Sequence, residues 1–180
     1  LYAPIAQLGI MGEEFYEDPR VVEFAAHMEI LRDKGINKCA RIADFELMEI
    51  YNIAPSIVVL DVEGRPVRYR IRFAGTFVVG IYGSETTGLF LDDLNLGSNK
   101  QKLIDIYDQL LKSRRPQWTR TLIVKDKPVN ANQSGQQVFA YQRLSYPLVD
   151  EDDTIQRIVS IIAHQPASGL TVPFESRELN

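Results

Sequence analysis

The chain has 180 residues, of which 45% are hydrophobic and 24% are charged. This length suits one domain with short extensions, and this composition excludes a disordered chain, a collagen-like fibre and a disulfide-rich miniprotein. The 20 Lys and Arg residues against 24 Asp and Glu residues give a net charge of −4. Nucleic-acid binders usually carry a basic domain or stripe, so the charge argues against nucleic acid as a direct partner.

Cysteine and histidine are scarce. Cys39 is the sole cysteine, and His27 and His164 are the two histidines. These residues form no internal disulfide and show no metal-ligand spacing, so we expect no metal site. No apolar run approaches the roughly 20 residues that span a bilayer, and the N-terminus lacks the pattern of a signal peptide. We therefore expect a cytoplasmic protein that does not enter the membrane.

A helix is predicted over residues 19–34. Asp18 can cap its first turn, Pro19 suits the first helical position, and Gly35 marks its end. Apolar residues recur between these signals at helical spacing. A second, short helix is predicted over residues 45–51.

Residues 57–73 are predicted to form a β-hairpin. A β-branched run leads into the turn residues 63–66, after which the chain alternates strictly between an apolar and a basic face. The apolar face comprises Val67, Tyr69, Ile71 and Phe73, and the basic face comprises Arg68, Arg70 and Arg72. The basic face is interpreted as an outer sheet face paired with acids such as Asp61 or Glu63. The alternative is a surface for an anion or an acidic partner.

Helices follow the hairpin. Gly75 breaks the strand, and Thr76 can cap a short helix after it. Ser98 can cap a longer helix over residues 99–113, whose apolar residues form one stripe. Pro116 prevents this helix from continuing.

Three strands are predicted over residues 117–125, 136–149 and 155–164. A polar loop at 126–135 separates the first two. The last strand is apolar on both faces, which is typical of a central strand. The resulting fold class is α+β, with a five-stranded antiparallel sheet, helices on one face, and room for a pocket between sheet and helices.

This order of elements resembles that of a PAS domain. The segments RIRFAGT (70–76), Tyr82-Gly83, Thr87-Gly88 and Leu91-Asp92-Asp93-Leu94 resemble a PAS-like family of small proteins found mainly in alphaproteobacteria. Residues 143–148 (RLSYPL) are similar to its pre-terminal strand. The resemblance covers residues 40–164, preceded by a lead-in and flanking helix at 1–39 and followed by an irregular tail at 165–180. It implies that Gly75, Thr76, Gly83 and Gly88 define the fold.

The resemblance also implies a use for the flanking helix and for the interior. Such a helix packs on the outer sheet face or mediates a homodimer, and apolar residues on both faces of 155–164 require one of these covers. The candidate pocket residues are Phe73, Tyr82, Phe90, Tyr107, Trp118, Tyr141 and Arg143. Their alternative is ordinary core. Arg143 either faces the pocket, where it could bind a ligand carboxylate, or faces outward as a surface ion-pair residue.

Two cofactors of PAS domains require residues that can be sought in the sequence. Haem-binding members supply an axial His from the helix before the third strand, and residues 99–113 contain no His. Photosensory flavin members carry a reactive Cys in an Asn-Cys-Arg-like motif on a mid-domain helix, and Cys39 lies outside that position. The sequence therefore argues against haem and photoreactive flavin, and leaves the cofactor unknown.

The predicted function is a non-catalytic, PAS-like sensory or signalling module that binds a small molecule or a protein partner. One alternative is a ligand-free dimerisation scaffold. Another is a small-molecule isomerase or cyclase on a cone-shaped α+β fold, which requires a carboxylate or His base inside the pocket. Asp61, Glu63 and His164 fall at turns or strand ends, and no hydrolase, Walker or dinucleotide motif is present.

Overall fold

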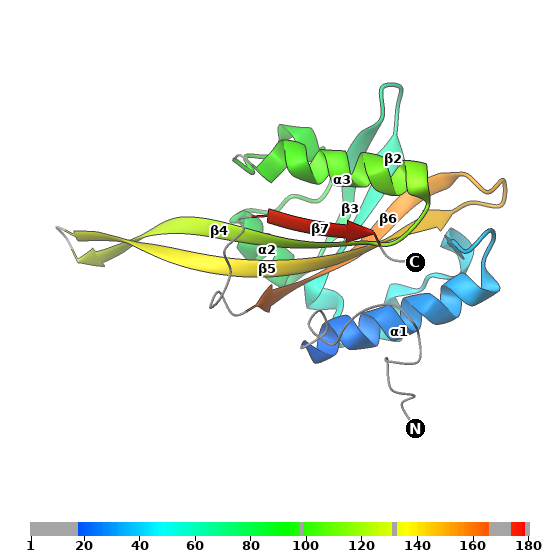
Figure 1. The fold of residues 1–180 in the computed structure, drawn as a ribbon, viewed down its shortest axis with the longest axis horizontal. Coiled ribbons are helices and arrows are strands. Elements are labelled where there is room, and N and C mark those ends of the chain that lie inside the picture. The colour runs from blue at the N-terminus through cyan, green and yellow to red at the C-terminus, as the bar shows by residue number, and fades with distance from the viewer. Residues whose placement is uncertain (1–17, 98, 131–132, 166–173, 179–180) are drawn as a thin grey trace.

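A twisted, mainly antiparallel sheet organises the chain (Figure 1). The computed structural model describes residues 18–97, 99–130, 133–165 and 174–178. Along the sheet the strands lie in the order β3 (Arg68–Ala74), β2 (Ile57–Glu63), β6 (Ile155–Gln165), β5 (Gln133–Val149), β4 (Gln117–Asn130) and β7 (Phe174–Glu178). The two-residue strand β1 (Ala40–Arg41) pairs in parallel with the end of β5. The predicted α+β fold is confirmed, with six strands along this path rather than five.

The additional strand, β7, lies in the tail that was predicted to be irregular. It runs antiparallel to β4, from Gln117 opposite Glu178 to Thr121 opposite Phe174. Its five residues, FESRE, include three charges and carry no strand signal of their own. The free edge of β4 supplies the backbone donors and acceptors that make this segment a strand.

Helix α1 (Pro19–Lys34) begins and ends where the sequence predicts. The Asp18 carboxylate accepts a hydrogen bond from the backbone N–H of Arg20 at 2.9 Å, and Gly35 follows the last turn. The buried face of α1 packs against one face of β5 and β6. Phe24 and Met28 are completely buried there, which stabilises the fold by roughly 1.5–3 kcal/mol for each side chain. The helix of the same chain therefore supplies the predicted cover of the outer sheet face.

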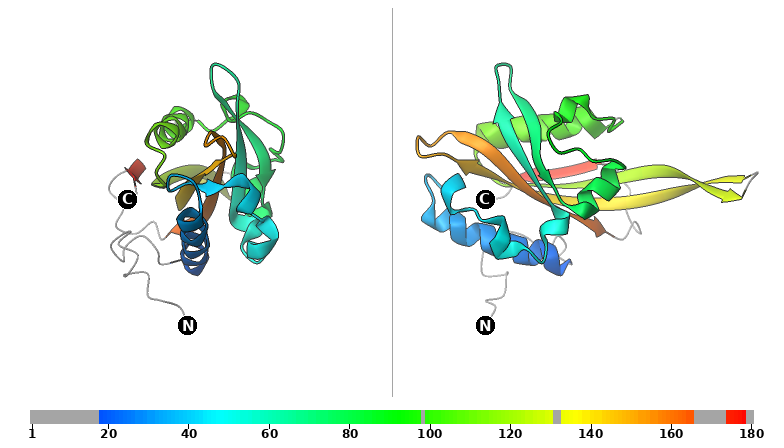
Figure 2. Two further views of the ribbon diagram at one scale, coloured as in Figure 1. Left: turned by 90° about the vertical axis from the view of Figure 1, so that its right-hand side faces the viewer. Right: turned by 180° about the vertical axis from the view of Figure 1, so that it is seen from behind.

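Two further helices cover the opposite, inner face of the sheet (Figures 1 and 2). These are α2 (Thr76–Tyr82) and α3 (Asn99–Ser113). A second apolar cluster joins Val78 of α2 and Leu110 of α3 to Ile158 and Ile162 of β6. Because β6 also buries Val159 and Ile161 under α1, it is apolar on both faces, as predicted for a central strand.

Three local expectations differ from the structure. The helix predicted over 45–51 is replaced by 3-10 turns at Ile42–Asp44 and Leu47–Ile50, because Phe45 and Glu46 between them are extended. Thr76 is the first residue of α2 and not its cap; Gly75 holds the cap position and no side chain caps the helix. The predicted cap Ser98 lies outside the described residues.

The predicted turn glycines have the expected backbone. Gly83 ends α2 with φ +81°, and Gly88 has φ +87°. Both angles lie in the left-handed region that favours glycine.

Strands β4 and β5 extend into the segment that was predicted to be a polar loop (126–135), with β4 reaching Asn130 and β5 beginning at Gln133. Pairing extends to Pro128 opposite Ser134 and Asn130 opposite Gln133. The result is a long two-stranded arm that projects from the body of the sheet (Figure 1). Backbone pairing between two strands does not require apolar side chains, so a polar sequence does not prevent it.

Acid is expected to destabilise the protein through His27. This side chain of α1 packs edge-on to Phe45, with ring centroids 6.5 Å apart. Burial lowers the pKa of His27 from its usual 6.5, and Glu49 and Glu23 only partly oppose this. The unfolded chain therefore binds more protons, so the stabilisation from neutral His27 is complete above about pH 6.5 and is lost as the pH falls towards the folded pKa.

We expect His27→Gln to flatten the fall in melting temperature between about pH 7 and pH 5. Burial also lowers the pKa of His164, so His27→Gln combined with His164→Gln should flatten it further. A pH profile that neither variant changes would contradict this assignment.

Candidate functional site

The seven predicted pocket residues do not share one location. Tyr141 and Arg143 of β5 lie on the inner face of the sheet, and Tyr82 of α2 and Tyr107 of α3 pack against that face. Three others lie elsewhere and are corrected: Phe73, Phe90 and Trp118.

Strand register explains why two of these residues face outward. Trp118 pairs with Leu144, and both lie in the outer cluster beneath α1. The pairing of β2 with β3 is irregular between Val59 and Leu60, which oppose Phe73 and Ile71 respectively. This bulge interrupts the strict alternation, so Phe73 packs against the outer cluster while Ile71 stays in the inner one.

Phe90 packs on the arginine side chains of β3. The guanidinium carbons of Arg68 and Arg70 lie 3.7 and 4.7 Å from the centre of its ring. These are cation–π distances, and Phe90 also forms a β-bridge with Arg70, so it lies against β3 and not in the inner cluster.

The arginines of β3 are paired with acids, as the first interpretation of the basic face predicts. Arg72 lies 2.8 Å from Asp61, and Arg70 lies 2.9 Å from Glu63. Arg68 contacts the neighbouring carboxylates of Asp92 and Asp93. Asp61 and Glu63 are therefore held in ion pairs, and neither is placed as the buried base that the enzyme alternative requires.

Arg143 is the centre of the inner site. Its Nη1 donates a hydrogen bond to the hydroxyl of Tyr107 at 2.6 Å, and its Nη2 donates to the hydroxyl of Tyr82 at 3.2 Å. The sheet, α3 and α2 each contribute one of these residues. A guanidinium has five N–H donors, so this geometry leaves donors available beyond the two tyrosines.

The charge of Arg143 has no counter-charge within the described part of the chain. No carboxylate there forms an ion pair with it. Burial raises the pKa of Tyr107, although Arg143 itself acts in the opposite direction, so this phenol stays neutral. Arginine keeps its proton in proteins. The arrangement is thus a partly buried cation held by two tyrosine hydroxyls.

Further polar groups lie on the inner sheet face around Arg143. The hydroxyls of Ser145 and Ser160 are 2.8 Å apart, and Tyr107 also hydrogen-bonds Ser160. Gln117 and Thr119 of β4 lie opposite Ser145 and Arg143 and are 1% and 3% exposed. Buried polar groups in a sheet centre are uncommon unless they are satisfied or bind something.

Sequence reasoning missed these polar residues, although a signal was present. Tyr141, Arg143 and Ser145 alternate along β5, so all three share one face. If one of these three side chains points to the inner face, the alternation predicts that the other two do so as well.

Next to Arg143 along β5 lies an aromatic group. The rings of Tyr141 and His164 are 4.8 Å apart, and Phe77 of α2 lies 4.8 Å from His164. His164 itself is exposed, so it is not an enclosed base. The described residues include no cluster of three or more His, Cys, Asp or Glu that could hold a metal.

Cys39 lies away from this group, in the turn after α1. It is buried, its Sγ is 3.5 Å from the carbonyl oxygen of Arg114, and burial raises the pKa of its thiol. This environment suits an unreactive thiol.

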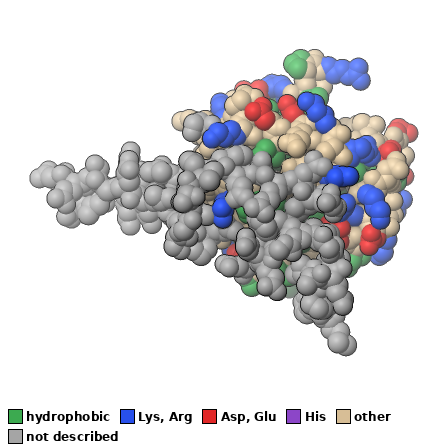
Figure 3. Space-filling view, in the orientation of Figure 1, with side chains coloured by type: hydrophobic (Ala, Val, Ile, Leu, Met, Phe, Trp, Pro, Cys, Tyr) green, Lys and Arg blue, Asp and Glu red, His purple; other side chains and the backbone are tan. Residues whose placement is uncertain are grey.

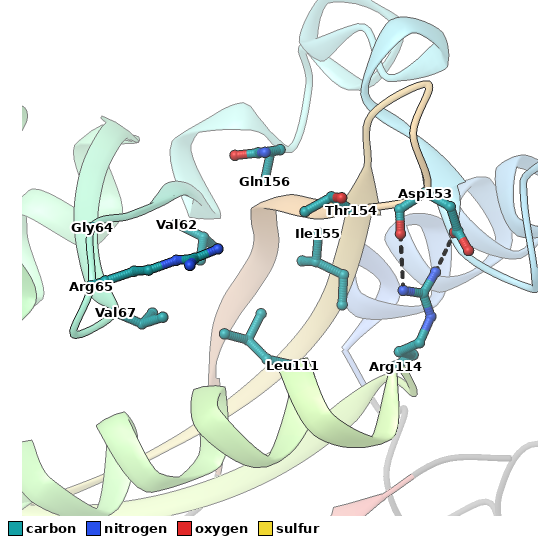
Figure 4. Close-up of a pocket in the computed structure, with 10 residues that line it drawn as sticks. All are labelled: Val62, Gly64, Arg65, Val67, Leu111, Arg114, Asp153, Thr154, Ile155 and Gln156. Carbon is teal, nitrogen blue, oxygen red and sulfur yellow. Dashed lines mark hydrogen bonds and ion pairs between the residues drawn. The ribbon is translucent and has the colours of Figure 1, made fainter.

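A separate open groove lies at the far end of the hairpin (Figure 4). It is lined by Val62, Gly64, Arg65, Val67, Leu111, Arg114, Asp153, Thr154, Ile155 and Gln156, and its volume is about 490 Å³. The β2–β3 turn, the end of α3 and the start of β6 form its walls. Basic and acidic side chains are interspersed over the part of the surface that Figure 3 colours by type, without a large patch of one charge.

Comparisons with known proteins show no family for this chain. No family model and no curated protein matches the chain. The similar solved structures are light-oxygen-voltage (LOV) domains, which belong to the PAS superfamily. A LOV domain studied with a flavin analogue is 14% identical, with a TM-score of 0.45 over 69% of this chain and 87% of that one.

Two other similar structures have comparable scores. The light-state structure of the blue-light photoreceptor Aureochrome1 LOV is 12% identical, with a TM-score of 0.43 over 68% of this chain and 91% of that one. The Rhodobacter sphaeroides LOV protein is 18% identical, with a TM-score of 0.38 over 63% of this chain and 61% of that one. A likeness at this level assigns no ligand to the chain.

These structures correct one expectation. The sequence argues against photoreactive flavin, yet the similar structures are LOV photoreceptor domains, one of them studied with a flavin analogue. The expectation against photoreactive flavin is therefore withdrawn, and flavin belongs among the ligands to be tested. Among the described residues, no helix has the length and apolar character needed to cross a membrane.

Proposed function

We propose that the chain is a non-catalytic sensory module of the PAS type that binds a small anionic molecule through Arg143. The observation that supports this most directly is the partly buried guanidinium with unused donors and no counter-charge among the described residues. Guanidinium groups recognise carboxylates and phosphates through paired hydrogen bonds. An anion at Arg143 would supply the counter-charge that this guanidinium lacks among the described residues.

The same contacts suggest how binding would be transmitted. Tyr82 is the last residue of α2, and Tyr107 is in the middle of α3. An anion that draws the Arg143 donors away from either hydroxyl would change how that helix is held against the sheet. A module with two such arrangements responds to the ligand through its difference in affinity for them.

We expect Arg143→Met to weaken binding of the molecule, so that less of it is retained. Native mass spectrometry of the wild-type protein should show a mass above that of the denatured chain, and a visible absorbance spectrum would identify a flavin. Charge-assisted hydrogen bonds contribute about 1.5–3 kcal/mol, so affinity should fall by about 10- to 100-fold. The melting temperature of the unliganded variant should not decrease, because the change removes an unpaired charge from the interior.

Arg72→Met is the matched control, since Arg72 is an exposed arginine paired with Asp61 on β3. It should leave ligand binding unchanged. Wild-type protein that neither retains a molecule nor binds any of a set of small carboxylates, phosphates and flavin mononucleotide would contradict the proposal and favour the ligand-free scaffold. Equal retention by the Arg143 variant would contradict the assigned residue.

A further inference from the structure

The groove between the β2–β3 turn and the end of α3 has an apolar floor. Val62, Val67, Leu111 and Ile155 supply its aliphatic surface and come from three different parts of the chain (Figure 4). Val67 is 45% exposed, and none of the four is fully buried. Aliphatic groups gathered in a concave surface gain free energy when another apolar group covers them.

One cation at this groove has no partner among the described residues. Arg65, in the turn between β2 and β3, extends its side chain along the groove beside Val62 (Figure 4). Within that part of the chain no carboxylate forms an ion pair with Arg65. The neighbouring carboxylate, that of Glu63, pairs with Arg70 instead. The rim of the groove therefore carries one uncompensated positive charge on this side.

The opposite end of the groove is neutral. The guanidinium of Arg114 contacts both the backbone oxygen and the carboxylate of Asp153 (Figure 4). The same carboxylate accepts a hydrogen bond from the side chain of Asn37 at 2.6 Å. The Arg114–Asp153 ion pair forms this end of the groove and contributes no net charge. Through Asn37 it also contacts the turn after α1.

We propose that this groove binds a small amphiphilic anion, with its carboxylate at Arg65 and its aliphatic body over the apolar floor. Charge complementarity requires a single negative group at the Arg65 end and an apolar group beyond it. The volume of about 490 Å³ falls within the range of roughly 300–1,000 Å³ that is typical of small-molecule sites. A protein partner would need a much wider surface, about 800 Å² on each side.

The site is independent of Arg143. Its residues come from the hairpin turn, the last turn of α3 and the β5–β6 turn, and none of them contacts Arg143. The proposal thus concerns a second site and does not depend on the proposed function.

Decanoate is a suitable probe, and methyl NMR of the full chain can locate it. We expect its titration to shift the methyl signals of Val62, Val67, Leu111 and Ile155. Decyltrimethylammonium, which has the same tail and the opposite charge, should bind at least tenfold more weakly, as expected for a charge-assisted contact. Arg65→Gln should weaken decanoate about tenfold, and Val67→Asp should abolish its shifts.

Two control variants test whether the binding is specific to this groove. Lys112→Gln removes an exposed cation next to Leu111 that does not line the groove, and should leave affinity unchanged. Arg143→Met should leave the groove signals unchanged, so a failure of one site does not obscure the other. Methyl shifts confined to the Arg143 region, equal affinity for both probes, or full affinity in Arg65→Gln would each overturn the proposal.

Discussion

Replacing Glu29 by Ala is expected to lower the free energy of unfolding by about 3–5 kcal/mol, the cost of leaving its buried ion-pair partner alone. Glu29 lies on the face of α1 that packs against the sheet. Its two carboxylate oxygens both lie 2.7 Å from Nη1 of Arg32, and one accepts a hydrogen bond from the hydroxyl of Tyr146 on β5 at 2.8 Å. Both charged residues are at most 9% exposed.

The loss would extend beyond one ion pair. Arg32 also donates from Nε to the backbone oxygen of Lys38 at 3.0 Å, which holds the turn after α1. Without Glu29, the charge of Arg32 would remain buried without its ion-pair partner, and the hydroxyl of Tyr146 would lose this acceptor. α1 should therefore separate from the sheet at lower denaturant concentration.

Glu23→Ala is the matched control, because Glu23 lies on the same helix and accepts from the exposed side chain of Asn52. It should cost less than about 1 kcal/mol, as is usual for exposed polar contacts. Urea unfolding monitored by circular dichroism measures both variants. Equal losses in the two would show that the buried network does not anchor α1.

The second large effect is expected at Gly75, where the chain leaves β3 and enters α2. A Cβ atom at this position would lie 2.2 Å from the backbone oxygen of Ala54 and 2.4 Å from that of Pro55. The N–H of Gly75 also donates to the backbone oxygen of Ile57 at 2.9 Å. Gly75 is required for this close approach and not for an unusual backbone angle, because its φ is −66°.

We expect Gly75→Ala to lower the free energy of unfolding by about 3 kcal/mol. The new Cβ atom would clash with backbone atoms, which cannot relieve the clash by changing rotamer. Gly80→Ala is the control, because Gly80 lies within α2 and a Cβ atom there would have no described neighbour within 4 Å. That change should stabilise the protein by about 0.5–1 kcal/mol through helix propensity. Urea unfolding measures both variants, and two equal effects of the same sign would contradict this account.

The inner site shows where sequence reasoning succeeded and where it could not. Alternation along β5 places Tyr141 and Arg143 on one face, but it does not reveal whether that face points to the helices or to solvent. Trp118 is predicted for the pocket because it is large and apolar, yet its register opposite Leu144 turns it towards α1. Such register depends on contacts between strands that are distant in sequence.

Phe73 and β7 show two further limits. A bulge of one residue in the hairpin moves Phe73 to the other face, and alternation alone does not predict where a bulge occurs. Strand β7 forms because β4 presents a free edge, and not because its own residues favour a strand. The length of the β4–β5 arm could likewise not be predicted from the sequence, because its polar residues are typical of loops.

The sequence by itself determined the α+β class, the bounds of α1 and α3, the hairpin of β2 and β3, and the central place of the strand that is apolar on both faces. These features follow from local capping, period and composition, which act over a few residues. Only the tertiary structure decided which side of the sheet each side chain faces, that α1 covers the outer face, and that Tyr82 and Tyr107 meet Arg143. Those outcomes depend on pairing and packing between segments that are distant in sequence. A local sequence pattern does not determine the free energy of these contacts.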